Sequence, residues 1–313
     1  MKRNLTIKFC LIVCLFFCVS HLSAEAPNKH SLLAPFRSGG NDGLNNLILI
    51  PQMESAISHG KDAILFEVST EIIGNNFLDV EGLSFITNDA KAIESHARLT
   101  WGVLEYLDLS IDFSFTDYSG QITALINDES VFFANSTANR EITDPVLEAR
   151  FQVWGGERPG TGLSFRGAVK FPVGDNQDLH STGAFDFSAG LLGSLDLDWG
   201  VWHANFNHTF VGEQKVFRSQ ANIELTNTTS FGLGYMFEIL PNRWAAGIQI
   251  LGFSNPFRNV RDDLVSFNGI PISVVIGTRW YPYRNVFLEL GGGPGLTPDA
   301  ADYSLFFNLG YQR

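Results

Sequence analysis

Cysteine, long apolar runs and charge are all scarce in this chain. Its 313 residues include three cysteines, and all three lie within the first 18 positions. After residue 19, no apolar run approaches the roughly 18 to 20 residues that a membrane-spanning helix needs. Charged residues make up 17% of the chain, below the roughly 25% of an average soluble domain. The absence of long apolar runs excludes a helical membrane bundle, and the 45% of apolar residues excludes a disordered chain.

The N-terminus has the pattern of a secretory signal peptide. Basic residues at positions 2, 3 and 8 precede an apolar stretch over residues 9–19, and Ala24 and Ala26 supply the small residues that signal peptidase reads. We therefore expect residues 1–26 to be cleaved on export, with an uncleaved anchor as the alternative. The remaining chain would contain no disulfide, thiol nucleophile or cysteine metal site.

The charge of the exported chain disfavours nucleic acid as a partner. Removing Lys2, Arg3, Lys8 and Glu25 from 21 basic and 33 acidic residues leaves 18 and 32, a net charge of −14. Such a surface repels phosphate groups. We expect no cofactor and no metal site.

What is abundant is glycine, with 30 residues, and phenylalanine, with 27. Both suit antiparallel β-structure with aromatic faces and tight turns. Beyond residue 60, segments of about ten residues alternate apolar and polar side chains, a pattern typical of transmembrane β-strands. In the clearest segment, residues 107–116, apolar residues (Leu, Ile and Phe) alternate with polar residues (Asp, Ser and Thr), so the two faces differ completely in polarity.

Twelve segments have this pattern, and the connections between them test the count. Those after segments 1, 3, 5, 7, 9 and 11 are long, including residues 118–144, and those after the even segments are short. An even-stranded barrel with long extracellular loops and short periplasmic turns predicts this alternation. The predicted strands cover residues 62–74, 91–102, 105–117, 145–155, 161–172, 183–196, 199–211, 228–239, 243–254, 270–281, 284–291 and 302–312.

Residues 27–60 lack any sustained period of two, and the stretch around residues 37–43 is typical of irregular loop. We expect this region to be a periplasmic lead-in or a short plug, followed by the outer-membrane barrel over residues 61–313.

Aromatic residues gather where the barrel would meet the membrane surface. Trp and Tyr residues beside the predicted short turns predict an interfacial girdle at one end of the strands: Trp101, Trp154, Trp199, Trp244, Trp280 and Tyr281. The last strand alternates from Tyr303 to Tyr311 and resembles the C-terminal strand that bacterial barrel-assembly machinery recognises. The expected partners are therefore outer-membrane lipid and that machinery.

Two short motifs carry a family resemblance. The run Lys170-Phe171-Pro172-Val173-Gly174 is similar to a basic-apolar-Pro-Thr-Gly turn, and the His-x-Asn of His203 and Asn205 is similar to a second motif of the same family. Residues 147–212 thus resemble an uncharacterised family of Gram-negative outer-membrane proteins, domain of unknown function 3187. The resemblance implies an outer-membrane location and a barrel fold, and it implies no activity.

If the apolar faces meet lipid, charged side chains of both signs converge on the lumen from four sequential strands. The opposite arc carries only Arg279 and Glu289 as charges. This asymmetry would orient a polar solute in a pore, although cross-strand ion pairs could instead fill a closed interior. The lumen residues predicted to contact a solute are Glu94, His96, Arg98, Asp108, Asp112, Glu148, Arg150, Arg166 and Lys170.

A barrel-embedded hydrolase needs a serine within reach of a histidine base. His208 faces outward in the predicted register, but Phe210 holds the position where that serine would stand, so we expect no enzyme. We predict an all-β, antiparallel, up-and-down transmembrane barrel of about 12 strands in the bacterial outer membrane. Its expected function is a porin-like channel for small polar solutes. A closed structural or adhesive barrel is the main alternative, and a soluble ligand-binding barrel is a third.

Overall fold

The fold was analysed in a computed structural model of the chain. It describes residues 29–38, 49–74, 79–80, 83–126, 129–136, 140–174, 181, 183–212, 215–216, 223–254, 257–258, 270–297 and 300–313. The expected signal peptide, residues 1–26, lies outside the described residues. Within the described ranges, no helix is both long and apolar enough to cross a membrane.

Twelve long strands form the wall, and each corresponds to one of the twelve predicted segments. They are β1 (Ile64–Gly74), β3 (Leu83–Leu104), β4 (Leu107–Ile126), β7 (Val146–Gly155), β8 (Gly162–Lys170), β9 (Asp186–Leu197), β10 (Gly200–Phe210), β13 (Thr228–Leu240), β14 (Trp244–Phe253), β16 (Ile272–Tyr283), β17 (Val286–Pro294) and β18 (Tyr303–Gln312). Every pairing between them is antiparallel and joins strands that follow one another along the chain, apart from β1 with β18. That last pairing closes the ring, so the predicted fold class is confirmed.

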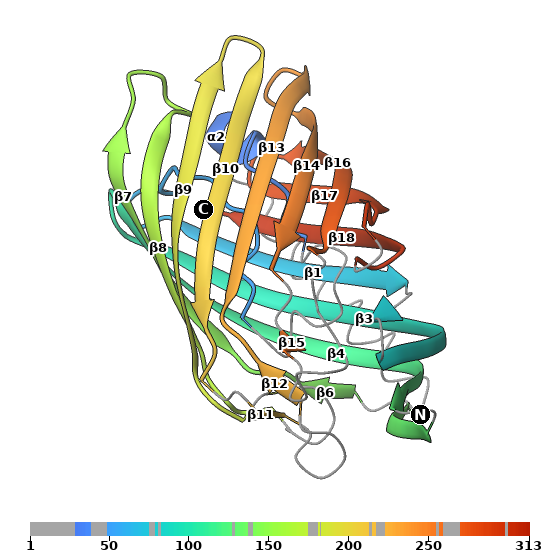
Figure 1. Cartoon of the computed structure of the whole chain (residues 1–313). Coiled ribbons are helices and arrows are strands. Elements are labelled where there is room, and N and C mark those ends of the chain that lie inside the picture. The colour runs from blue at the N-terminus through green and yellow to red at the C-terminus, as the bar shows by residue number, and fades with distance from the viewer. Residues whose placement is uncertain are drawn as a thin grey trace, which may run out of the picture.

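Shorter elements accompany the wall. The helix α2 (Lys29–Leu32) precedes β1, and the short strands are β2 (Asp79–Val80), β5 (Glu129–Ser136), β6 (Arg140–Ile142), β11 (Lys215–Val216), β12 (Ile223–Leu225) and β15 (Phe257–Arg258). In Figure 1, β9, β10 and β13 cross in front of β1, β3 and β4, and α2 is seen behind β10 near the short turns; Leu32 of this helix packs on inward residues such as Leu65 of β1 and Val201 of β10. The ring therefore encloses chain that precedes its first strand.

The β3–β4 hairpin is longer than the sequence predicts. β3 begins at Leu83 rather than residue 91, and β4 continues to Ile126 rather than ending at 117, with β5 and β6 paired along it. The expected long connection over residues 118–144 is thus largely β-structure. Apolar and polar residues do not alternate cleanly over residues 83–90 and 118–126, so a period of two does not reveal these strands.

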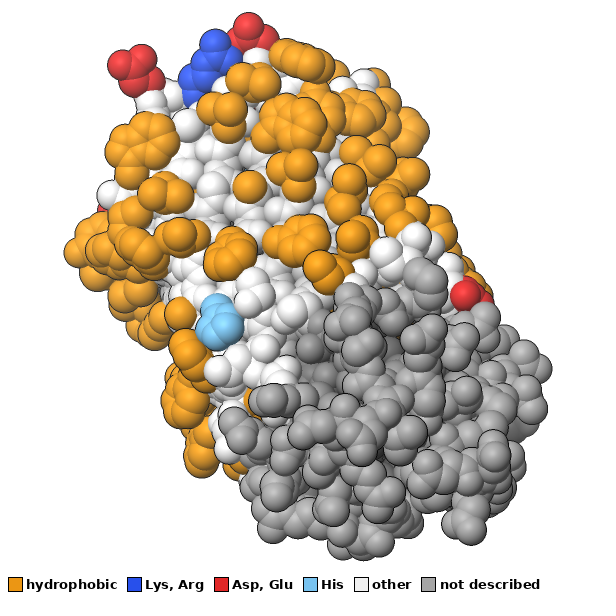
Figure 2. All heavy atoms as spheres, viewed as in Figure 1, with side chains coloured by type: hydrophobic (Ala, Val, Ile, Leu, Met, Phe, Trp, Pro, Cys, Tyr) orange, Lys and Arg blue, Asp and Glu red, His pale blue; other side chains and the backbone are white. Residues whose placement is uncertain are grey.

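The two faces of the wall differ as the alternation predicts. On β8, Phe165 is 53% exposed while the adjacent Arg166 is 4% exposed. Across the wall the exposed side chains are apolar and the buried ones are largely polar or charged, the inverse of a soluble protein. Figure 2 shows hydrophobic side chains spread over the described part of one face, with charged groups only near its margins. This outer surface suits contact with lipid.

One member of the predicted aromatic girdle is wrongly assigned. The five tryptophans are 38% to 70% exposed, but Tyr281 is 3% exposed and packs on Phe287 inside the barrel. Tyr281 directly follows the outward-facing Trp280, and successive strand residues point to opposite faces.

Candidate functional site in the barrel lumen

The structure places the nine residues predicted to contact a solute on the inward face of the wall. They lie on β3, β4, β7 and β8, which are neighbours in the wall. Seven are buried, and His96 and Asp112 are half-buried. The register places Arg98 opposite Asp112, and Asp108 opposite Arg150. We call this set the charged arc.

Most charges of the arc are paired with one another. The Arg98 guanidinium lies 2.7 Å from Glu148, Arg150 forms an ion pair with Asp108, and His96 lies 3.3 Å from Asp112. At the other end of the arc, the Lys170 ammonium lies 2.9 Å from Asp186 and 3.3 Å from Asp144. The arc is therefore close to balanced, and an ion in the lumen would meet few uncompensated charges.

Two stretches of chain from before β1, residues 31–38 and 49–59, lie against the inward faces of the strands. We call them the inner segment. The second stretch follows the lumen lengthwise: Thr209 Oγ1 donates to the carbonyl of Leu49 at 2.7 Å, Arg166 to that of Gln52 at 2.7 Å, and Arg150 to that of Ser55 at 2.8 Å. Wall side chains thus satisfy backbone groups of this second stretch, residues 49–59, which contains no helix or strand.

Glu54 is the main charged contact between the inner segment and the charged arc. Its carboxylate is 3% exposed and lies 2.5 Å from Arg98, 2.9 Å from Arg37, and 3.8 Å from both Arg150 and Arg166. Burial alone would raise the pKa of Glu54, but these guanidinium groups outweigh it and hold the pKa well below the usual 4.5. One carboxylate therefore binds arginines from three wall strands to the inner segment.

The first stretch, residues 31–38, is held by apolar packing and by hydrogen bonds from Arg279. Leu32, Leu33 and Phe36 are buried in a cluster with inward residues of β1, β10, β13, β14, β16, β17 and β18. Arg279 pairs with Glu289, as the register of β16 and β17 allows, and also donates to the carbonyls of Ser31, Leu32 and Pro35. The two charges predicted on the opposite arc thus form one ion pair that also caps this stretch.

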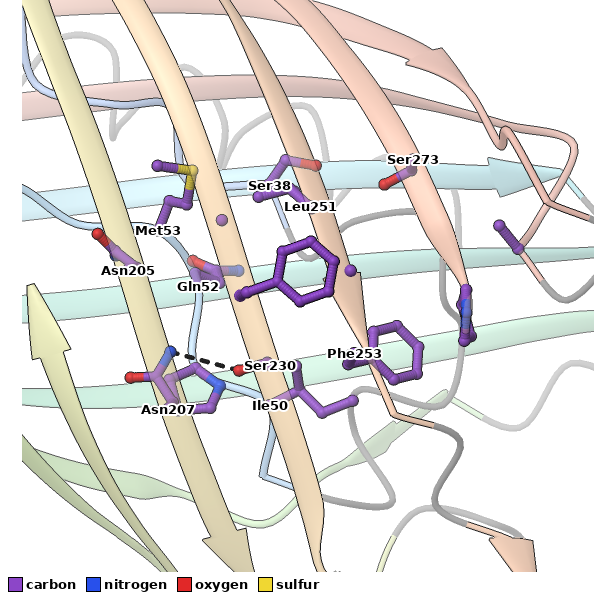
Figure 3. A pocket seen from close by; sticks show the side chains of 16 residues that line it. Ser38, Ile50, Gln52, Met53, Asn205, Asn207, Ser230, Leu251, Phe253 and Ser273 are labelled. Carbon is purple, nitrogen blue, oxygen red and sulfur yellow. Dashed lines mark hydrogen bonds between the residues drawn. The ribbon is translucent and has the colours of Figure 1, made fainter. Parts of the chain in front are cut away.

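Three cavities lie beside the inner segment among the described residues. One borders the charged arc, is lined by residues such as His96, Arg98 and Lys170, and has about 650 Å³ of empty space, part of it open to solvent. A second lies between the inner segment and the strands β10, β13, β14 and β16, with about 470 Å³ of empty space that is also partly open to solvent (Figure 3). The third, of about 410 Å³, lies between the two stretches of the inner segment and the strands β1, β16 and β17. The described lumen is therefore narrowed by the inner segment and not filled completely.

Sequence reasoning missed the partners that the charged arc has outside its four strands. Glu54 and Arg37 lie in a region without periodicity, Asp144 directly precedes the predicted strand 145–155, and Asp186 lies within the predicted strand 183–196. Glu67 and Glu71, on β1, are buried on the inward face. Alternation within residues 64–72 was a signal that could have found these two, whereas no signal in the sequence points to Glu54.

The fold and its surface define a transmembrane β-barrel whose lumen holds a peptide segment. The chain belongs to the family described as "Putative MetA-pathway of phenol degradation", whose model matches residues 62–266. This match corrects the resemblance to domain of unknown function 3187. Among curated protein sequences, none matches the chain significantly.

The structure explains why the two short motifs misassigned the family. Lys170 is the inward residue that pairs with Asp144 and Asp186 at the end of a strand, and His203 and Asn205 are successive inward residues of β10. Inward-facing polar residues two apart, and polar residues on the inward face up to the end of a strand, are general properties of barrel strands. They report on the fold and do not separate one barrel family from another.

The chain is similar to several solved structures. An outer membrane channel from Pseudomonas putida F1 superposes with a TM-score of 0.62 at 13% identity, covering 82% of this chain and 97% of that one. At this identity the likeness shows the fold alone. The CymD monoaromatic hydrocarbon channel gives 0.47 at 9% identity, covering 94% and 98%. The toluene transporter TbuX from Ralstonia pickettii gives 0.45 at 9% identity, covering 81% and 90%.

Proposed function

We propose that this protein is a bacterial outer-membrane channel for small, uncharged, polar aromatic solutes, and that the inner segment is its plug. The observation that carries the proposal is that a piece of chain outside the strands, joined to β1 at one end and otherwise held by non-covalent contacts, occupies the lumen of a closed barrel. A structural barrel can fill its interior with wall side chains alone. When the inner segment leaves the lumen, the barrel has an open pore.

The comparisons support this proposal in two ways. The Pseudomonas putida structure that shares the fold is itself described as an outer membrane channel. The description of the family names phenol, a small aromatic alcohol. Phenol is polar and uncharged at neutral pH, so it fits both the expected class of small polar solutes and a lumen whose charges are mutually paired.

We propose two membrane partners on the basis of the outer surface. The exposed apolar side chains of the wall, such as Phe206 and Phe307, would contact outer-membrane lipid. The β18 strand presents alternating outward side chains up to Tyr311, and we propose that barrel-assembly machinery recognises it after export.

One observation favours the alternative of a closed structural or adhesive barrel. The ion pairs of the charged arc and the contacts of Glu54 are mutually satisfied, as in an interior that never opens. The two functions differ in whether the plug leaves the lumen under any condition.

Single-channel recording separates the two functions. Refolded protein comprising residues 27–313 would be inserted into planar bilayers, and phenol or benzoate would be titrated at neutral pH. We expect small discrete openings that phenol reduces in a saturable way, whereas benzoate, with the same ring and a negative charge, has little effect. A protein that is folded and inserted but gives no openings would favour the closed barrel.

A further inference from the structure

The second cavity differs in character from the charged arc. Inward faces of β10, β13, β14 and β16 form one side of it, and residues 50–53 of the inner segment form the other. None of its described lining residues is charged. In Figure 3, Asn205, Asn207 and Ser230 lie on the strand side, with Gln52 and Met53 facing them from the inner segment. The cavity therefore suits an uncharged molecule with both polar and apolar parts.

Asn205 is the polar group in this cavity that points to a ligand. It is 5% exposed, and among the described residues neither the oxygen nor the nitrogen of its side-chain amide has a hydrogen-bond partner. Its inward neighbours on β10 are satisfied. Asn207 donates to Ser230 at 3.3 Å and accepts from Arg166 at 2.6 Å, and His203 donates to the carbonyl of Leu33 at 2.7 Å and accepts from Ser194 at 2.9 Å. A buried amide without partners is costly, so a polar group that reached Asn205 would be bound favourably.

One part of the cavity is apolar and adaptable. Leu251 and Phe253 on β14 line it, and Met53 approaches from the inner segment. A Cβ atom on Gly232 would lie 2.6 Å from Cγ of Met53, so the glycine provides the room that the methionine occupies. Methionine is unbranched and flexible, and its side chain can move aside for a ring or a short alkyl group.

We propose that this cavity is a binding site for a small uncharged solute that carries a hydroxyl group on an apolar body. The hydroxyl would donate to Oδ1 of Asn205 or accept from its Nδ2, while the apolar body packs on Leu251, Phe253 and Met53. The proposal rests on the proposed function in one respect, because it places the solute inside the lumen. The charged arc on the far side of the inner segment would take no part in binding.

Two fluorinated probes that differ only in the hydroxyl test this site. Refolded protein in lipid nanodiscs would be titrated with 4-fluorophenol and with fluorobenzene and observed by fluorine NMR, with empty nanodiscs as the blank. We expect Asn205→Leu to weaken 4-fluorophenol binding about tenfold, the loss of roughly one hydrogen bond, and to leave fluorobenzene binding unchanged or stronger. Asn205→Ala, which also removes the amide, serves if the leucine variant does not fold.

The matched control is Ser304→Ala, which removes a buried polar group of β18 that does not line the cavity. It should leave both probes unaffected. If the Asn205 variants lose both probes equally, or neither, the assignment of Asn205 is wrong. Because this assay needs no current, the two proposals fail separately. If binding depends on Asn205 but the protein gives no openings, the binding site stands and the channel function is refuted. If the protein gives openings but binding does not depend on Asn205, the channel function stands and the binding site is refuted.

Discussion

Replacing Glu54 with glutamine should release the plug. The substitution preserves the shape of the side chain but removes the charge that faces Arg98, Arg37, Arg150 and Arg166. Arg98, Arg150 and Arg37 keep Glu148, Asp108 and Glu67 as partners, so three of the four guanidinium groups retain an ion pair, and Arg166 keeps its hydrogen bonds to Asn207 and to the carbonyl of Gln52. The loss therefore falls on the contact between the wall and the inner segment.

The size of the effect follows from the burial of this contact. Removing one partner of a buried ion pair costs about 3 to 5 kcal/mol, and we take the lower end because glutamine can still accept hydrogen bonds. About 3 kcal/mol corresponds to a roughly 100-fold change in the ratio of lodged to released segment. A channel that is closed for most of the recording should then open often enough to dominate it.

A disulfide tether shows whether the released segment causes the openings. The hydroxyl oxygens of Ser55 and Ser194 lie 3.5 Å apart, which suits Ser55→Cys paired with Ser194→Cys. All native cysteines lie at or before position 18, so this pair would be alone in residues 27–313. Glu54→Gln should raise the open probability of the channel. In a protein that carries Glu54→Gln together with the two cysteines, oxidation should restore the closed state and reduction should open the channel again.

Glu157→Gln makes the same chemical change in an exposed turn and should leave the recording unchanged. The reasoning is refuted if Glu54→Gln conducts as the parent protein does, or if the oxidised tether fails to close it.

Two further predictions concern the wall and the effect of pH. Phe206 is 54% exposed on the outer face of β10. Phe206→Arg should therefore lower the free energy of unfolding from lipid vesicles, measured by urea titration, by about 2 to 4 kcal/mol, whereas Trp199→Arg in a short turn should lower it by only about 0 to 1 kcal/mol. Equal losses for the two variants would contradict the predicted membrane position. Because arginines hold the pKa of Glu54 well below 4.5 when the plug is lodged, its contribution is complete above that value and is lost as pH falls through the lowered pKa. Conductance should thus be constant from about pH 5 to 8 and rise only in stronger acid, and an increase that begins near neutrality would rule out Glu54 as the controlling group.

The wall could be predicted from the sequence because the alternating polarity of a strand in lipid can be recognised from consecutive residues alone. Each residue of β8, for example, faces either lipid or lumen, and the alternation of Phe165 and Arg166 records which. The same rule identified the inward residues of the charged arc. It also indicates that Tyr281, next to Trp280, faces inward, a point that the girdle interpretation overlooked.

The contents of the lumen could not be predicted in this way. Glu54 meets Arg98, Arg150 and Arg166 only after the strands have closed into a ring, and its own neighbours in the chain have no period. The unpartnered amide of Asn205 is likewise a product of tertiary packing, because the sequence does not distinguish it from Asn207 two residues later. A pattern of polarity shows which way a side chain points, and it does not show what the side chain meets.

The pairing of β1 with β18 has a consequence for how the molecule must be built. Leu65 pairs with Gln312 and Gly74 with Tyr303, and Ile64 and Arg313 exchange backbone hydrogen bonds beyond them. Partners across this seam are separated by nearly the whole length of the wall, whereas every other long strand pairs with its successor. Until the seam forms, the sheet has two open edges that can pair with other chains, and such distant contacts form slowly. The pairing of β18 with β1 therefore decides whether a nearly complete sheet closes into a barrel or aggregates.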